Sequence, residues 1–578
     1  MTKKTLKYIH LRESIVGILF FCGLMAIGGF AAYLQVFKGQ WLSRKAAGQY
    51  EKSVTLVGSR GTIYDAQKRE MAVSIDTTSI AAHPSQIKDP KKTAKILATA
   101  LKLNRAAVLK KITANKPFVW IKRQVSPRDV ARVRESGVAG IAFIPEHSRF
   151  YPNKQLAAQV LGFTGIDGRG LEGIEFYYNK YLTGTPRQVT IRKDALGRDF
   201  DYKRSSVLST QGNSLVLTID RTIQFMVEEA LRETVEKYAG RSGIAVVMAP
   251  VTGEILAMAH FPFFNPNSYG QYHRDLWRNR AITDAFEPGS TMKIFSAAAA
   301  LDSGTSGPNT IYFCENGKYA IGPNTVHDTK PHGWLSLQQV VKYSSNIGAI
   351  KVVERMGSKP LYTYLKTFGF GEKTGIDSPG ESYGSLSSYR HWTKIDTGTI
   401  AFGQGVATTA LQLITAASAI ANDGIMMKPY FVKAILDPNG REIVRNEPVQ
   451  LGRVISTNTA RTMRRILKTV ITEGGTGVQA ALNEFSVGGK TGTAQKIEEG
   501  GGYSKDRFIA SFLGFAPADR PEAVALILVD EPQGQHYGGI VAAPGFKRIM
   551  YKTLTYFDTK EDLEPGNLTI ALEDDNRG

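Results

Sequence analysis

One uncharged stretch near the N-terminus constrains this chain more than any other feature. Residues 14–37, SIVGILFFCGLMAIGGFAAYLQVF, form a helix-length apolar run that can cross the roughly 30 Å hydrocarbon core of a bilayer. Lys and Arg residues precede it, as is typical of a cytoplasmic flank. A cleaved signal peptide has a shorter apolar core of about 7–15 residues. We therefore expect a cytoplasmic tail (1–13), a single-pass anchor in the cytoplasmic membrane (14–37) and an extracytoplasmic remainder.

The composition excludes several classes of protein. Of the 578 residues, 42% are hydrophobic and 21% are charged, which is a globular and not a disordered composition. The two cysteines, Cys22 and Cys314, lie far apart, so no disulfide framework is available. The net charge of +20 indicates anionic surroundings. No helix-turn-helix, zinc-finger or RNP-like run accompanies it, so we expect anionic lipid and glycan, and no nucleic acid.

The pattern of predicted strands, turns and helices changes near residue 210. Residues 38–210 mix short apolar strands with polar turns and show no catalytic cluster. Beyond them, strand-like runs at 243–249, 254–260, 485–496, 507–516 and 522–530 enclose a mostly helical stretch. This order indicates an α+β domain in which an antiparallel sheet is covered by a helical lobe. We place a pedestal domain at 38–210, the α+β domain at 211–558 and a solvated acidic tail at 559–578.

Ser290 and Lys293 form the first chemistry-bearing pair. Pro and Gly end a loop just before Ser290, and an Ala-rich helix follows. Ser290 therefore falls in the first helical turn, where unpaired N–H groups favour a developing oxyanion. Lys293 shares its face, and a lysine made neutral by burial can take a serine proton. The pattern alone is weak, since Ser85 and Lys88 also match it in a loop.

Two further motifs follow along the chain. Ser344 and Asn346 lie at a break between two predicted helices, where a hydroxyl can relay protons and an amide can hold a peptide group. The run Gly-Lys-Thr-Gly-Thr at 489–493 lies in the first of the late strands, so its residues alternate between the two faces. Gly492 leaves room there for a substrate to lie against the backbone. A second Lys-Thr-Gly at 373–375 lies among turn-formers with no strand to display it.

The order of the three motifs is more informative than any one of them. Ser-x-x-Lys, Ser-x-Asn and Lys-Thr-Gly, in this order, form the active-site set of penicillin-binding proteins and class A β-lactamases. The chain resembles a class B penicillin-binding protein, a membrane-anchored peptidoglycan D,D-transpeptidase, most similar to the FtsI-type enzyme of cell division. The stretches RGTIYD, GRGLEGIE, FGFGEKTGIDSPGE and FGQGVATTALQLITAASAIANDG also resemble segments of that family.

The resemblance implies a fold and a role for each residue. It implies an elongated, dimerisation-type pedestal and a transpeptidase domain with a five-stranded antiparallel sheet. Ser290 would be the nucleophile, Lys293 its base, Ser344 a proton relay and Asn346 a holder of the donor peptide amide. Lys490, Thr491, Gly492 and Thr493 would bind the terminal carboxylate of the stem peptide or its β-lactam counterpart. No metal or organic cofactor is implied.

The expected partners also follow from the resemblance. They are peptidoglycan stem peptides, β-lactam antibiotics, a SEDS-type glycosyltransferase and other divisome membrane proteins. Three alternatives remain: an elongation-type transpeptidase, a hydrolytic β-lactamase or carboxypeptidase, and a non-catalytic sensor or divisome scaffold. The deacylating Glu-x-x-Leu-Asn of class A β-lactamases is absent. Cys314, His327, Asp328 and His332 are metal-ligand types within nineteen residues, but we favour turn polarity and a buried thiol there and predict no metal site.

Overall fold

The structure, a computed structural model, describes residues 3–42, 51–56, 58–185, 187–192, 211–498 and 500–562. Its contacts divide the chain into two units, Met1–Gly58 with Thr185–Gln211, and Ser59–Gly184 with Gly212–Gly578. The first unit contains helix α1 (Lys3–Val36) and an antiparallel ribbon of β1 (Glu51–Leu56) and β6 (Arg187–Arg192). The second unit contains every residue of the three motifs.

Helix α1 contains the apolar run. Its segment Leu11–Val36 has 26 residues and a mean hydropathy of 2.3, and none of it is buried against the protein. Among the described residues it is the one helix long and apolar enough to cross a membrane. A signal sequence near an N-terminus meets the same criteria, so retention of the anchor stays a prediction.

The part of the second unit that follows residue 211 is built on a five-stranded antiparallel sheet, as predicted. The strands lie in the order β20 (Gly488–Ile497), β21 (Tyr503–Ala516), β22 (Ala523–Asp530), β8 (Ser242–Met248) and β9 (Ile255–Phe261). The chain enters the sheet with the hairpin β8–β9 and returns to it more than 200 residues later. The α+β fold, with helices inserted between two groups of strands, is therefore confirmed.

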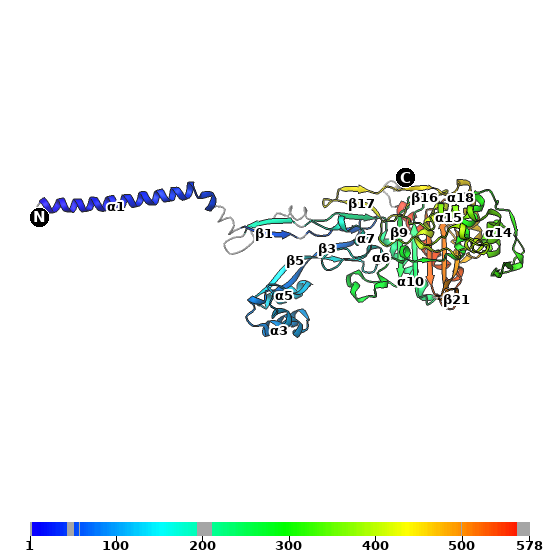
Figure 1. Ribbon diagram of the computed structural model, residues 1–578, viewed down its shortest axis with the longest axis horizontal. Helices are drawn as coiled ribbons and strands as arrows, with labels where there is room; N and C mark the ends of the chain where they lie inside the picture. Colours follow the sequence, from blue (N-terminus) through cyan, green and yellow to red (C-terminus); the bar gives the residue numbers. More distant parts are fainter. Residues whose placement is uncertain are drawn as a thin grey trace, which may run out of the picture. The chain divides into compact units, whose positions relative to one another are not determined.

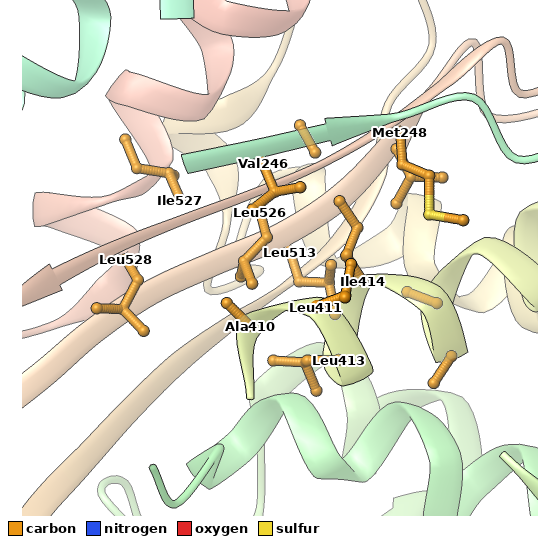
Figure 2. Packing of buried hydrophobic residues seen from close by; sticks show 14 of the residues in the cluster. Val246, Met248, Ala410, Leu411, Leu413, Ile414, Leu513, Leu526, Ile527 and Leu528 are labelled. Carbon is orange, nitrogen blue, oxygen red and sulfur yellow. The ribbon is translucent and has the colours of Figure 1, made fainter. Parts of the chain in front are cut away.

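Helices cover both faces of this sheet, which explains why β8 and β22 are buried along their whole length. Helix α17 (Ala410–Ala421) is itself buried at every residue. In Figure 2 its Leu411 and Ile414 point towards Leu513 of β21 and Leu526 of β22. The opposite face is covered by α10 (Arg221–Lys237) and α20 (Ala543–Asp562). Residues 563–578, most of the predicted acidic tail, lie outside the described residues.

The inserted lobe supplies the helices that position the first two motifs. It includes short strand pairs as well as helices, and the helix Lys293–Asp302 packs against the helices Asn346–Met356 and Ser358–Thr367. The lobe's helices include α11 (Arg280–Thr283), η4 (Gly289–Met292), α12 (Lys293–Asp302), α13 (Leu337–Tyr343), α14 (Asn346–Met356), α15 (Ser358–Thr367), α16 (Lys394–Ala401), α17 and α18 (Thr457–Ile471).

A second sheet joins strands of the expected pedestal (38–210) to strands of the expected α+β domain (211–558). Its order is β18 (Glu442–Arg445), β17 (Val432–Leu436), β7 (Ser214–Leu217), β2 (Ile63–Tyr64), β3 (Glu70–Ala82) and β4 (Val119–Val125), with β5 (Ile141–Phe150) also paired to β3. Strand β7 pairs in parallel with β2 and antiparallel with β17. Its main chain therefore hydrogen-bonds to one strand that precedes the expected boundary near residue 210 in the sequence and to one that follows it.

Beyond that junction, strands β3, β4 and β5 carry a small helical layer, visible at the lower left of the second unit in Figure 1. Helices α3 (Pro90–Leu101), α4 (Arg105–Ile112) and α5 (Pro127–Glu135) enclose a hydrophobic cluster separate from the main core. Each helix begins with a side-chain cap, from Asp89, Asn104 and Ser126 respectively. This layer carries none of the motif residues except the decoy pair Ser85 and Lys88.

A buried ionic cluster joins the two pedestal stretches that carried the resemblance. Glu175, at the end of GRGLEGIE, is fully buried and pairs with Arg60 and Arg149. Arg60 also donates from Nη1 to the carbonyl of Gly168, at 3.2 Å. Burial raises the pKa of Glu175, but the two guanidinium groups outweigh it and hold the pKa below its ordinary value. The carboxylate therefore stays charged and bridges the two segments.

Substituting Glu175 with alanine is expected to destabilise the protein by about 3–5 kcal/mol, because it leaves two buried guanidinium groups without their counter-charge. Denaturant unfolding of the purified chain measures this loss. Asp167→Ala is the matched control: Asp167 is 77% exposed and pairs with Arg123 at the surface, so its loss should cost no more than about 1 kcal/mol. Equal effects of the two substitutions would contradict the assigned role of the cluster.

Candidate active site

Ser290 lies in the short 3₁₀ turn η4 that leads directly into α12, as the sequence predicted. The turn begins at Gly289, whose φ is +55°, and a Cβ there would lie 2.8 Å from the carbonyl oxygen of Thr493. Glycine is thus required for both the backbone angle and the close approach of β20. The serine is partly exposed and lies beside the strand that carries the third motif.

Lys293 occupies the centre of the site. Its side chain is 1% exposed, and its Nζ lies 3.0 Å from Ser290 Oγ. It also lies 2.7 Å from the carbonyl oxygen of Ser344, 3.2 Å from Ser344 Oγ and 2.7 Å from Asn346 Oδ1. Burial lowers the pKa of Lys293 to about 7, a shift that the carboxylate of Asp328 opposes. A sizeable neutral fraction is therefore present near neutral pH.

Ser344 lies between α13 and α14 in the left-handed region, with φ +63°. Such an angle is unusual for a residue with a side chain and must be held by surrounding contacts. Asn346 begins α14; its Nδ2 donates to the carbonyl of His327 at 3.1 Å, so its Oδ1 faces Lys293. A capping box of Ser336 and Gln339 forms at the start of α13.

Lys490 reaches the same cluster from β20. It is fully buried, and its Nζ donates to Ser344 Oγ at 2.9 Å and to the carbonyl oxygen of Thr491 at 3.2 Å. Burial, and then the positive charge of Lys293, lower the pKa of Lys490 well below its ordinary value. Ser344 Oγ is thus shared by two lysines from different elements.

The remaining residues of the third motif also lie along this wall. Thr491 Oγ1 is 3.0 Å from Thr476 Oγ1, and Thr493 Oγ1 accepts from the N–H of Gly538 at 3.1 Å. A Cβ on Gly492 would lie 2.2 Å from Ser511 Oγ and 3.0 Å from Thr291. Glycine is needed here for packing against the Ser290 turn, and its role in giving a substrate room stays a prediction.

The structure thus brings an alcohol, two poorly solvated amines, a second alcohol and an amide into one hydrogen-bonded cluster. This set can deprotonate an alcohol without a metal ion and can pass a proton onward. The decoy copies lie elsewhere: Ser85 is in the 3₁₀ turn η1 (Pro84–Gln86) of the pedestal, and Thr374 donates to Glu381.

Sequence reasoning missed two carboxylates beside the site. Glu287 accepts from the N–H of Gly405 at 2.7 Å and from Tyr503 at 3.3 Å, and burial raises its pKa. The sequence marks Asp328 only as a metal-ligand type, yet in the structure it accepts hydrogen bonds from the Ser-x-Asn segment. Among the described residues no group of three or more His, Cys, Asp and Glu is placed to hold a metal ion. The His332 ring stacks on Tyr343.

Comparison with known proteins agrees with this geometry. The family profile "Penicillin binding protein transpeptidase domain" matches residues 243–551, and "Penicillin-binding Protein dimerisation domain" matches residues 55–217. The chain is 34% identical over 543 residues to the probable peptidoglycan D,D-transpeptidase PenA of Neisseria meningitidis, covering 92% of this chain and 89% of the relative. It is 33% identical over 561 residues to peptidoglycan D,D-transpeptidase FtsI of Escherichia coli, covering 95% and 92%.

A solved structure is similar as well. Penicillin-binding protein 3 of Mycobacterium tuberculosis, in complex with aztreonam, has a TM-score of 0.68 and 28% identity, covering 87% of this chain and 97% of that one. The chain therefore belongs to the class B penicillin-binding proteins, which combine a dimerisation domain with a transpeptidase domain. It is a peptidoglycan D,D-transpeptidase of the serine type, so its chemistry implies stem peptides as substrates and β-lactams as acylating ligands.

Proposed function

We propose that Ser290 is the nucleophile of this transpeptidase and that Lys293 is its base. A neutral lysine has two N–H donors and one lone pair. The carbonyl oxygen of Ser344 and Asn346 Oδ1, both 2.7 Å away, can only accept, and they take the two donors. The lone pair is then left for the Ser290 hydroxyl at 3.0 Å. This arrangement is the observation that carries the proposal.

The reaction then proceeds through an acyl-enzyme. Ser290 Oγ attacks the penultimate D-Ala carbonyl as Lys293 takes its proton, and the N–H groups of Ser290 and Thr493 stabilise the oxyanion. A single such donor contributes about 3–4 kcal/mol to lowering a barrier. Ser344 passes a proton from the lysines to the departing D-Ala amine. The amine of a second stem peptide then attacks the ester carbonyl and gives a proton to Lys293. Lys293 returns a proton to Ser290 Oγ as the ester C–O bond breaks, which forms the cross-link and restores the free serine.

The other motif residues bind the donor peptide. Asn346 keeps one N–H of Nδ2 for the substrate amide, because His327 takes the other. Lys490, Thr491 and Thr493 bind the terminal carboxylate, with Gly492 keeping the strand close to the nucleophile.

Digestion and peptide mass mapping after exposure to a labelled penicillin test the assignment of Ser290 as the nucleophile. The label is expected on the peptide that contains Ser290; a label on Ser344 or any other serine would overturn it.

We further propose that the enzyme acts at the septum, anchored by residues 14–37 with its pedestal (38–210) and transpeptidase domain (211–558) outside the cytoplasmic membrane. Similarity to FtsI over nearly the whole chain supports this role. Its partners would be a SEDS-type glycosyltransferase and other divisome membrane proteins, tested by co-purification from detergent-solubilised membranes.

Depleting the protein in its host separates the alternatives. Filamentous cells with blocked septa are expected for a division enzyme, whereas swollen, rounded cells would assign it to elongation. Complementation by Ser290→Ala during depletion is expected to fail. Normal growth with that variant would mean that the chain acts as a scaffold and that its chemistry is dispensable.

A further inference from the structure

One acidic side chain outside the three motifs contacts the second motif at consecutive positions. Asp328 directly follows the hairpin of β12 (Lys318–Ile321) and β13 (Asn324–His327). Its Oδ2 accepts from Ser345 Oγ at 2.6 Å, and its Oδ1 accepts from the N–H groups of Asn346 at 2.5 Å and Ile347 at 3.0 Å. The carboxylate therefore satisfies the first N–H groups of α14, where an anion is favoured.

These contacts act where the backbone needs support. Ser344, with φ +63°, immediately precedes the three residues that Asp328 holds. The neighbouring carbonyl of His327 fixes the amide of Asn346, so Oδ1 of Asn346 faces Lys293. On the side of α13, the N–H groups of Ser344 and Ser345 both bond to the carbonyl of Val340. Asp328 and His327 hold the segment from the other side, at the start of α14.

We propose that Asp328 is a positioning residue of the transpeptidase reaction: it pins the Ser344–Asn346 segment over Lys293 and keeps a negative charge behind that segment. The proposal rests on the roles assigned above to Ser290 and Lys293. Asp328 does not touch a reacting atom. It acts through Ser345, Asn346 and Ile347, and its charge acts across the segment on the lysine.

Within the part of the chain that the structure describes, two charged groups act on Lys293, and they come from different elements. Lys490 approaches from β20, and Asp328 lies behind the break between α13 and α14. The carboxylate raises the pKa of Lys293 against the larger lowering by burial. Removing the charge alone should therefore move the protonation midpoint of Lys293 to lower pH. Cys314, buried beside Ser345, is another titratable group near Asp328.

Two substitutions separate geometry from charge. Asp328→Asn keeps an oxygen for the N–H groups of Asn346 and Ile347 and removes the charge, whereas Asp328→Ala removes both. The measurement is the second-order rate of acylation by a labelled penicillin as a function of pH. For Asp328→Asn we expect the midpoint, near 7 in the parent, to move to lower pH, with a plateau rate within about tenfold of the parent. For Asp328→Ala we expect a plateau rate lower by about 100-fold, because the segment is displaced.

Asp89→Ala is the matched control, since it also removes an aspartate that caps a helix, α3 of the pedestal. It should leave the midpoint and the plateau unchanged. An unmoved midpoint in Asp328→Asn, with the parent labelled at Ser290, would overturn the inference and leave the proposed function standing. A parent that is not labelled at Ser290 would overturn the proposed function itself. Should Asp328→Ala fail to fold, the midpoint of Asp328→Asn still decides the question.

Discussion

Ser290→Ala is expected to abolish covalent labelling by penicillin completely. The variant removes the one hydroxyl that lies 3.0 Å from Lys293 Nζ in the turn beside β20, and no ester can form without it. Ser344 is also close to both lysines, but its hydroxyl accepts from Lys490 and its main chain is held in the left-handed region. Intact-mass analysis of the purified chain after exposure to penicillin gives the result directly.

The sequence offers its own control for this experiment. Ser85 and Lys88 repeat the Ser-x-x-Lys pattern in the pedestal, and both side chains are exposed. Ser85→Ala should leave the mass of the adduct and the rate of its formation unchanged. An adduct that persists in Ser290→Ala and disappears in Ser85→Ala would reverse the assignment of the nucleophile.

Lys293→Met is expected to lower the acylation rate by about 10³–10⁴-fold while making the protein more stable. The rate falls because the variant has no base to take the Ser290 proton. Stability rises because burying the lysine amine costs free energy on folding, and an apolar side chain of similar length avoids this cost. We expect a gain of about 1–2 kcal/mol. Thermal unfolding at pH 7 and stopped-flow acylation measure the two effects.

The pH dependence of that gain has a definite sign. Unfolding returns the pKa of Lys293 from about 7 to its ordinary value of about 10.4. Between these two values the unfolded chain binds more protons, so the parent protein becomes more stable as pH rises. The advantage of Lys293→Met should therefore be full below pH 7 and shrink towards pH 10. Lys88→Met, at an exposed decoy, should change neither rate nor stability, and a constant advantage at all pH values would contradict the assignment.

Local patterns in the sequence predicted the parts of this fold that depend on local order. The five strands of the catalytic sheet are apolar runs bounded by turn residues, and the break at Ser344 follows from a capping box and a second helix start. The three motifs could be brought together because their order is typical of one family. The decoys at 85–88 and 373–375 could be set aside by their setting in loops.

Features that depend on distant partners could not be predicted in the same way. Asp328 follows a strand in a turn-rich segment, and nothing local distinguishes a carboxylate that caps a helix seventeen residues away from one that is solvated. The pairing of β7 with β2 joins residues about 150 positions apart. The packing requirement at Gly492 could not be predicted either, because the closest neighbours of this glycine are Ser511 and Thr291, from two other elements.

The parallel pairing of β7 with β2 has a consequence for any attempt to produce the catalytic half alone. A fragment that starts at residue 211 would keep the sheet of β20, β21, β22, β8 and β9, but it would bare the main-chain donors and acceptors of β7 that Ile63 and Tyr64 now engage. An unpaired strand edge can pair with strands of other chains and so promotes aggregation. Soluble production of the catalytic half should therefore begin at residue 59, so that residues 59–184 of the same unit stay with it.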